Sequence, residues 1–224
     1  MSVLQNLPVT LCIDRAGIVP NDGETHQGIY DVNFLRLVPN MTIVAPKNVE
    51  ELDLALKWSL DFNYPLAIRY PKGYITENSD VKPIELGKWD IIKTGDSPLV
   101  ILAAGALMVE QAIIAARLLE TQGICAEVVN CRFIKPMDKE YLLSLANKLV
   151  VTVEDNQLSG GFGSGVLEFL SDNAVNSKVI RLAINEEFLT HGSTKELLKM
   201  TGLDAESIAN VCLDKLKEFE GSVI

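Results

Sequence analysis

The N-terminal part of the chain places two short apolar runs on either side of one helical pattern. The run LPVTLCID, residues 7–14, ends in a carboxylate and a turn, which is typical of a strand buried on both faces of a parallel sheet. Apolar residues recur at helical spacing over residues 49–62, with Asn48 as the expected N-cap. PLAIRYPKG, residues 65–73, predicts a strand that ends at Pro71, because proline cannot donate to a central ladder.

From residue 98 onward, apolar runs and helical patterns alternate more regularly. Strands are expected at residues 98–105, 124–134, 149–155 and 178–184, and helices at residues 108–119, 138–149 and 163–173. Two amphipathic segments, residues 195–200 and 206–219, are expected to pack on the sheet or against a partner subunit. Because alternating strands and helices imply right-handed crossovers, the pattern predicts an α/β protein with helices flanking parallel sheets.

A polar stretch separates the two patterns. Residues 74–83, YITENSDVKP, collect turn formers, charges and a proline, which favours a linker. We therefore expect residues 1–78 and residues 79–224 to form two parts. A chain of 224 residues is long enough for one large α/β domain or for two smaller ones.

The composition is that of an ordinary globular protein, with 22% charged and 48% hydrophobic residues, which argues against disordered, coiled-coil and collagen-like classes. A net charge of -10 provides no overall attraction for nucleic acid or anionic membranes. The N-terminus shows no leader pattern, and no apolar run approaches the ~18 residues of a membrane span. We expect a cytoplasmic protein that binds neither nucleic acid nor membrane.

The cysteines and histidines do not predict a metal site. All the cysteines lie within or beside apolar runs, without a C-x-x-C pair, and are interpreted as buried, reduced thiols: Cys12, Cys125, Cys131 and Cys212. With only His26 and His191 available, no cluster has metal-ligand spacing. A capping or hydrogen-bonding role is expected for His191, and Ser193 or Thr194 is expected to cap the helix that follows.

The chemically richest stretch is the loop DRAGIVPNDGETHQG, residues 14–28. It follows a strand, at the edge where open α/β sheets bind ligands. Its glycines permit close approach of the backbone, and the guanidinium of Arg15 offers a planar fork for a carboxylate or phosphate. His26 can donate, accept or carry a proton near neutral pH. A solvated turn would use many of the same residues, but Arg15 and His26 are not turn formers, and this favours a functional loop.

A second basic stretch, RYPKG at residues 69–73, is expected at the same edge. It places Arg69 and Lys72 near Arg15, and convergent cations suggest an anion site. The alternative is that Arg69 pairs internally and Lys72 is solvated. RYPKG alone does not decide between these interpretations.

Together these motifs resemble one enzyme family. The loop, LRLVPNMTIVAP at residues 35–46 and RYPKG are similar to stretches of the 1-deoxy-D-xylulose-5-phosphate synthases, which are transketolase-like thiamine diphosphate enzymes. CRFIKPMD, VTVEDN and GGFGSGV resemble successive stretches of that family's C-terminal domain. The resemblance implies half of a pyrimidine-binding domain followed by a transketolase C-terminal-like domain, at the C-terminal end of a longer protein.

The resemblance also implies a reaction and a site. These transferases join pyruvate to glyceraldehyde 3-phosphate with loss of carbon dioxide, for isoprenoid and thiamine biosynthesis. Arg15 and Lys72 would hold the acceptor's phosphate, and Asp22 would lie near its hydroxyl groups. His26 would lie near the donor-derived carbons as an auxiliary catalytic group. The family usually has arginine where this chain has Lys72, and lysine supplies a flexible point charge in place of a bidentate pair.

By the same resemblance, the cofactor is bound elsewhere. No GDG-type motif for the magnesium diphosphate occurs, and the activating glutamate and the aromatic shelf under the pyrimidine would lie upstream of Met1. We therefore expect no cofactor or metal ligands in this chain, which would be inert alone and would form a homodimer through its C-terminal domain. Alternatives are a split transketolase subunit, a pyruvate dehydrogenase β-like chain, and a non-catalytic assembly module.

Two further features are left outside the expected site. The turn GGFGSG, residues 160–165, lacks the third glycine of a G-x-G-x-x-G motif because Val166 stands there, so we interpret it as a tight turn with close helix packing. Glu154 and Asp155 end a strand and look like acid–base machinery, but the resemblance assigns their domain to assembly.

Overall fold

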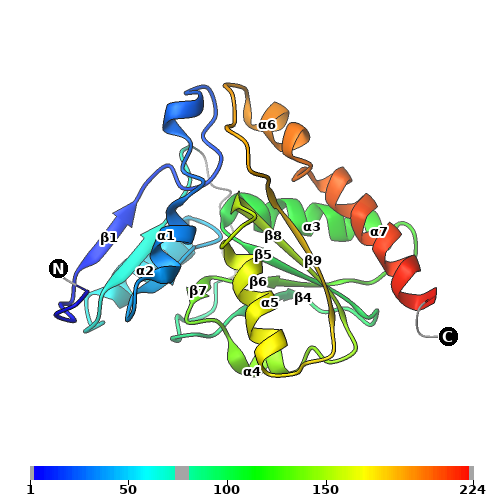
Figure 1. Ribbon diagram of the computed structural model, residues 1–224, viewed down its shortest axis with the longest axis horizontal. Helices are drawn as coiled ribbons and strands as arrows, with labels where there is room; N and C mark the ends of the chain where they lie inside the picture. The colour runs from blue at the N-terminus through cyan, green and yellow to red at the C-terminus, as the bar shows by residue number, and fades with distance from the viewer. Residues whose placement is uncertain (1–2, 74–80, 222–224) are drawn as a thin grey trace.

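The computed structural model describes residues 3–73 and 81–221, which fold around two sheets with helices on their faces (Figure 1). The smaller sheet has the order β1-β3-β2-β7, with β7 antiparallel to β2 and the other pairs parallel. Its strands are β1 Thr10–Ile13, β2 Thr42–Val44, β3 Leu66–Arg69 and β7 Phe133–Lys135. The helical elements of this part are the 3-10 turn η1 Glu24–His26, α1 Asp31–Leu37 and α2 Val49–Ser59.

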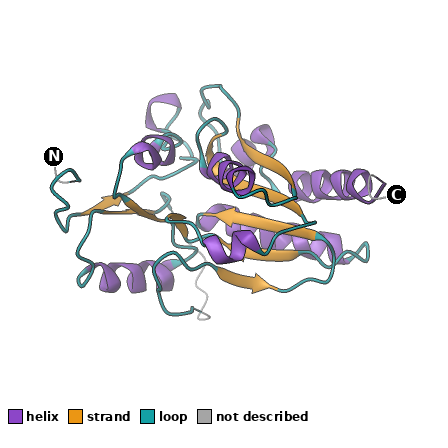
Figure 2. Ribbon diagram, turned by 60° about the horizontal axis from the view of Figure 1, so that its bottom comes forward, coloured by secondary structure: helices purple, strands orange, loops and turns teal. Residues whose placement is uncertain are grey.

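The larger sheet has the order β4-β6-β5-β8-β9, with β4 antiparallel to β6 and the other pairs parallel. Its strands are β4 Asp90–Lys93, β5 Leu99–Ala104, β6 Glu127–Asn130, β8 Leu149–Gln157 and β9 Lys178–Ile184. Helices lie on both sides of this sheet (Figure 2): α3 Ala106–Glu120, α4 Lys139–Leu143, α5 Phe162–Asp172, α6 Thr194–Thr201 and α7 Ala205–Gly221.

The two-residue period of β5 divides the core. Leu99, Ile101 and Ala103 pack in one cluster with α3 and α7. The intervening residues of β5 face the other way and pack with α5 and the smaller sheet. Because side chains alternate along a strand, the larger sheet is buried on both faces, and one of these faces joins it to the smaller sheet. The predicted α/β class and the alternation after residue 98 are confirmed.

The expected strand at residues 124–134 is wrong, because it divides into β6 and β7, which belong to different sheets. Between them, the buried Arg132 donates to the carboxylate of Glu51, and Asn130 donates to the same group. These polar contacts hold the turn that carries the chain from one sheet to the other. Both sheets are mixed rather than parallel, because β7 is antiparallel to β2 and β4 is antiparallel to β6. The expected helix at 138–149 shortens to α4.

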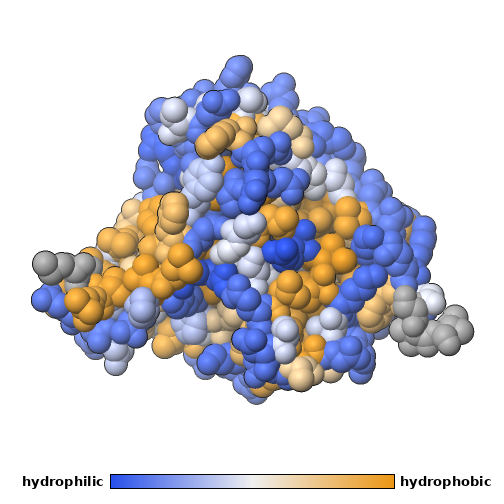
Figure 3. All heavy atoms as spheres, in the orientation of Figure 1, coloured by the Kyte–Doolittle hydropathy of each residue, from blue (hydrophilic) through white to orange (hydrophobic). Residues whose placement is uncertain are grey.

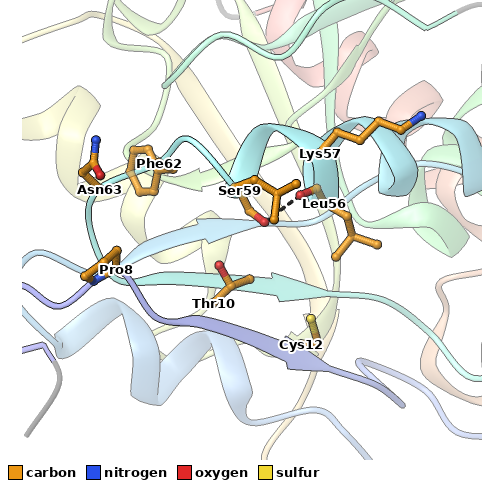
Figure 4. Close-up of a pocket in the computed structure, with 9 residues that line it drawn as sticks. Pro8, Thr10, Cys12, Leu56, Lys57, Ser59, Phe62 and Asn63 are labelled. Atoms are coloured by element: carbon orange, nitrogen blue, oxygen red, sulfur yellow. Dashed lines mark hydrogen bonds between the residues drawn. The ribbon is translucent and has the colours of Figure 1, made fainter.

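The expectation that β1 is buried on both faces is also wrong. Its one partner among the described strands is β3, so it forms an edge, and Leu11 and Cys12 are exposed. A groove of about 570 Å³ lies between β1 and α2, with Cys12 and Phe62 among its lining residues (Figure 4). The prediction of buried thiols is confirmed for Cys131 and Cys212, and Cys125 is half-buried. It is wrong for Cys12, which is exposed because β1 lies at the edge of its sheet.

Two predicted helix caps are confirmed. The side chain of Asn48 accepts from the backbone N–H of Glu51 at 2.9 Å, and Ser193 forms a capping box with Glu196. Most of the proposed linker, and the boundary at residue 78, lie outside the described residues. Among residues 3–73 and 81–221, no helix combines the length and the apolar character that crossing a membrane requires.

Replacement of Ser193 by alanine should lower the free energy of unfolding by about 1 kcal/mol, because the backbone N–H of Glu196 loses the hydroxyl that accepts its hydrogen bond. Chemical denaturation measures this change. Ser171→Ala, at an exposed position of α5, is the control and should change stability by less than about 0.5 kcal/mol. Equal effects of the two substitutions would contradict the cap.

Candidate functional site

The loop of residues 14–28 is closed by its own backbone. Gly17 and Gly28 exchange two hydrogen bonds, at 2.7 and 2.9 Å, as an isolated antiparallel bridge. The side-chain amide of Gln27 adds a second tie, since it accepts from the N–H of Val19 at 2.8 Å and donates to its carbonyl at 3.1 Å. These hydrogen bonds hold the loop in a defined conformation, which distinguishes it from a solvated turn.

Arg15 occupies the left-handed region, with φ 55, directly after β1. This conformation is uncommon for a residue with a side chain, and it turns the backbone so that Ala16 donates to the carbonyl of Tyr70 at 3.0 Å. The side chain of Arg15 remains 48% exposed and pairs with the neighbouring Asp14. The local strain thus presents an accessible guanidinium at the end of β1.

The structure brings together the other predicted site residues. Lys72 donates to the carboxylate of Asp22, which joins RYPKG to the loop. This hydrogen bond is the main cause that lowers the pKa of Asp22, and the positive charges of Lys72, His26 and Arg15 lower it further. Lys72, His26 and Arg15 therefore all act on the carboxylate of Asp22. These four exposed residues, Arg15, Asp22, His26 and Lys72, are called the rim of the loop below.

His26 lies at the end of the turn η1 and is exposed, with its Nδ1 at 2.9 Å from the hydroxyl of Thr25. The turn is covered from the side by the segment before α6. The N–H of Asn21 donates to the carbonyl of Gly192 at 2.9 Å, and a side chain at Gly23 would touch His191 at 3.8 Å. His191 thus packs beside the loop.

Arg69, in contrast, is not available to a ligand. It is buried, and its Nε donates to Asp31 at 2.8 Å, while both terminal nitrogens lie 3.4 Å from Asp155. Burial by itself would lower the pKa of Arg69, but the negative charges of Asp31 and Asp155 outweigh this effect and raise the pKa. The interpretation that Arg69 pairs internally is confirmed. The interpretation that Lys72 is merely solvated is wrong, because its ammonium group donates to Asp22.

Two residues beneath the loop were missed at the sequence level as parts of the site. Asp31 opens α1, and Asp155 lies in β8, far along the chain. The available signal was an acid at the end of a buried strand, which is the edge where α/β sheets build sites. Asp155 fits that pattern, but the pattern does not predict that Asp155 pairs with Arg69.

The turn at residues 160–165 is filled by protein. Phe162 and Gly163 donate their N–H groups to Glu154 at 2.6 and 2.7 Å, and burial raises the pKa of this carboxyl group to about 7. A side chain at Gly161 would approach Glu154 to 2.4 Å. The close helix packing expected from the sequence is therefore confirmed, and the N–H groups that a phosphate would need are occupied.

The described part of the chain also shows whether metal ligands come together. No group of three or more His, Cys, Asp and Glu side chains in residues 3–73 and 81–221 is arranged to hold a metal ion. The exposed charges of the loop and of Lys72 include two cations, Arg15 and Lys72, each paired with one carboxylate, and the carboxylate of Glu24. This arrangement suits recognition of a small anion.

Comparisons with protein families divide the chain into two matched domains. The transketolase pyrimidine-binding domain matches residues 1–77, and the transketolase C-terminal domain matches residues 87–208. The 1-deoxy-D-xylulose-5-phosphate synthase of Clostridium perfringens (strain ATCC 13124) is 48% identical over 218 residues, covering 95% of this chain and 35% of its own. That of Caldanaerobacter subterraneus is 46% identical over 223 residues, covering 98% and 36%.

Solved structures show the same architecture. A split gene transketolase, described as an inactive beta4 tetramer, superposes with a TM-score of 0.83 at 30% identity, covering 96% of this chain and 68% of its own. The transketolase of Campylobacter jejuni, at 21% identity and a TM-score of 0.71, covers 92% and 31% and supports the fold alone. This chain spans about a third of the length of the curated relatives that it matches.

Replacement of Lys72 by methionine should raise the pKa of Asp22 toward its ordinary value, because the hydrogen bond that lowers it is lost. The pair stabilises the fold above the ordinary carboxyl pKa, and this contribution disappears as the pH falls through the lowered value. Carboxyl-carbon NMR titration measures the shift. Lys57→Met, which removes a lysine paired with Asp53, is the control. An unchanged pKa in Lys72→Met would refute the pairing.

Proposed function

Since the chain belongs to the transketolase family, we propose that it forms the acceptor-binding part of a 1-deoxy-D-xylulose-5-phosphate synthase. The parent reaction joins pyruvate to glyceraldehyde 3-phosphate with loss of carbon dioxide, and its product feeds isoprenoid and thiamine biosynthesis. The observation that carries the proposal is the cluster at the rim of the loop, where Arg15 and Lys72 flank Asp22 and His26. Two cations and one carboxylate match a phosphorylated hydroxy-aldehyde.

In this assignment each rim residue has a separate partner on the acceptor. Arg15 and Lys72 bind the phosphate, the first through its planar fork and the second as a point charge. Asp22 accepts hydrogen bonds from hydroxyl groups of the acceptor and product. His26, exposed on η1, assists recognition or proton transfer near the donor-derived carbons.

Phosphate binding would replace the carboxylates that are paired with the two cations. Asp14 neutralises Arg15 and Asp22 neutralises Lys72 in the structure. A phosphate dianion takes both cations, because it carries more charge than either carboxylate. The displaced Asp22 is then free to receive the hydroxyl groups, so phosphate binding and sugar recognition become one event.

We further propose that the thiamine diphosphate and Mg²⁺ of the parent enzyme are held by the part of the synthase that this chain does not span, as the resemblance to the family implies. On this proposal we expect the chain to be inactive alone. We also propose a cytoplasmic location and a homodimer through the C-terminal domain. Both of these rest on the resemblance to the family.

An open face supports a requirement for further polypeptide. Apolar atoms gather at the β1 end of the molecule (Figure 3), and the exposed apolar side chains there include Leu4, Leu11 and Leu60. The unpaired edge of β1 and its groove would be covered by the part of the synthase that this chain does not span. A separate subunit is the second candidate arrangement, which is favoured by the likeness to a split gene transketolase.

Arg15→Ala should weaken binding of inorganic phosphate and of glyceraldehyde 3-phosphate by about tenfold or more, because a charge-assisted contact is removed. Lys72→Arg should tighten phosphate binding severalfold through bidentate geometry. Isothermal titration calorimetry measures both, with Lys93→Ala, in a surface pair with Glu120, as the control. Indifference of phosphate affinity to Arg15→Ala would favour the assembly module instead.

The chain supplied with pyruvate, glyceraldehyde 3-phosphate, thiamine diphosphate and Mg²⁺ should form no product. Addition of the remaining part of a relative's synthase as a second polypeptide should restore turnover and slow the alkylation of Cys12, which lies in the exposed groove. The half-buried Cys125 serves as the internal control. Product from the 224-residue chain alone would contradict the proposed division of the site.

A further inference from the structure

The end of β8, in the second part of the chain, lies beneath the loop of the first part. Asp155 faces Arg69 at 3.4 Å, and the N–H of Gln157 donates to the carbonyl of Ile29 at 3.0 Å. Asn33, in α1, returns a hydrogen bond to the carbonyl of Gln157 at 3.4 Å. Ile29, which follows the loop, and Arg69, which ends β3, therefore both contact the end of β8.

The carboxylate of Asp155 fills the space that a side chain at Gly17 would need. A Cβ at Gly17 would lie 1.8 Å from Oδ2 of Asp155, and Gly17 has φ +78, which favours glycine. On the other side of the network, a Cβ at Gly105 would lie 3.3 Å from Arg69, and its φ is +91. Two glycines with positive φ thus make room for the ion pairs of Arg69 with Asp31 and Asp155, which are called the network here.

The network fixes one arrangement of the loop base. Arg69 ends β3 and reaches Asp31 and Asp155, so one guanidinium joins the end of the smaller sheet to α1 and to the larger sheet. Gly17 rests on the Asp155 carboxylate two residues after Arg15, whose strained turn aims the phosphate-binding guanidinium outward. A shift of Asp155 would therefore move the backbone that carries Arg15.

We propose that Asp155 is a positioning residue for the acceptor-phosphate site, acting from the second domain through Gly17 and Arg69 on the direction of Arg15. This inference rests on the proposed function, because it assumes that Arg15 receives the phosphate. It goes beyond that function by giving the second domain a part in substrate recognition. Burial outweighs the attraction of Arg69 and raises the pKa of Asp155, which accords with its enclosed position.

A second buried network supplies a matched control. Glu51 is fully buried and accepts hydrogen bonds from Asn130 and Arg132, so it also links the two parts of the chain. Its partners lie outside the loop. Asp155→Asn and Glu51→Gln each neutralise one buried carboxylate without a large change in volume, and both should destabilise the protein.

The test compares hydrogen exchange and phosphate affinity in these two variants. Asp155→Asn should accelerate exchange of the Gly17 and Gly28 amides by about tenfold, because the loop base opens more often. It should weaken inorganic phosphate binding by a similar factor, since the competent arrangement is less populated. Glu51→Gln should leave both properties at the wild-type values. Gly17→Ala should weaken binding like Asp155→Asn, and the double variant should be non-additive.

The outcomes separate this inference from the proposed function. Equal loop exchange in Asp155→Asn and Glu51→Gln, or additive effects of Asp155→Asn and Gly17→Ala on exchange, would overturn the positioning role. Faster exchange in Asp155→Asn alone, together with phosphate binding that is insensitive to Arg15→Ala, would show that Asp155 fixes the loop base but that Arg15 does not receive the phosphate. In that case the proposed phosphate site, and not the positioning of the loop, would be wrong.

Discussion

The buried guanidinium of Arg69, held between Asp31 and Asp155, is the contact on which the arrangement of the site depends. It joins both sheets and α1 at the edge where the loop of residues 14–28 begins and ends. Removing one partner of such a buried pair typically costs 3–5 kcal/mol, because the other charge is left uncompensated. The fold therefore cannot relax at this point without moving the loop.

Above this rigid base, the rim of the loop carries charges that can exchange partners. Arg15 and Lys72 are accessible and hold carboxylates of the same chain, whereas Arg69 is enclosed. Burial thus distinguishes the three cations at this sheet edge. Arg69 is enclosed and supports the loop, whereas Arg15 and Lys72 are accessible to a ligand. On the function that we propose, Arg15 and Lys72 bind the substrate, and the buried ion pairs of Arg69 fix the geometry of the loop that carries Arg15.

Hydrophobic periodicity predicted most of the larger sheet, because its strands are buried and its helices amphipathic. It failed at residues 124–134, since an apolar run does not reveal that Asn130 and Arg132 turn inward to meet Glu51. It also predicted the burial of β1 wrongly, because a run of apolar residues does not show how many neighbouring strands or helices cover it. The rim residues were predicted from motifs, but Asp31 and Asp155 were not, since only the fold brings them together.

If the loop of residues 14–28 forms one wall of a phosphate site, inorganic phosphate should perturb its backbone amides. Titration of inorganic phosphate into the ¹⁵N-labelled protein, followed by amide NMR, measures this. We expect saturable shifts of the Gly17, Gly23 and Gly28 amides that are lost in Arg15→Ala, with Gly123 and Gly202 unchanged. Absence of these shifts, or their persistence without the Arg15 guanidinium, would show that the loop does not bind phosphate in this way.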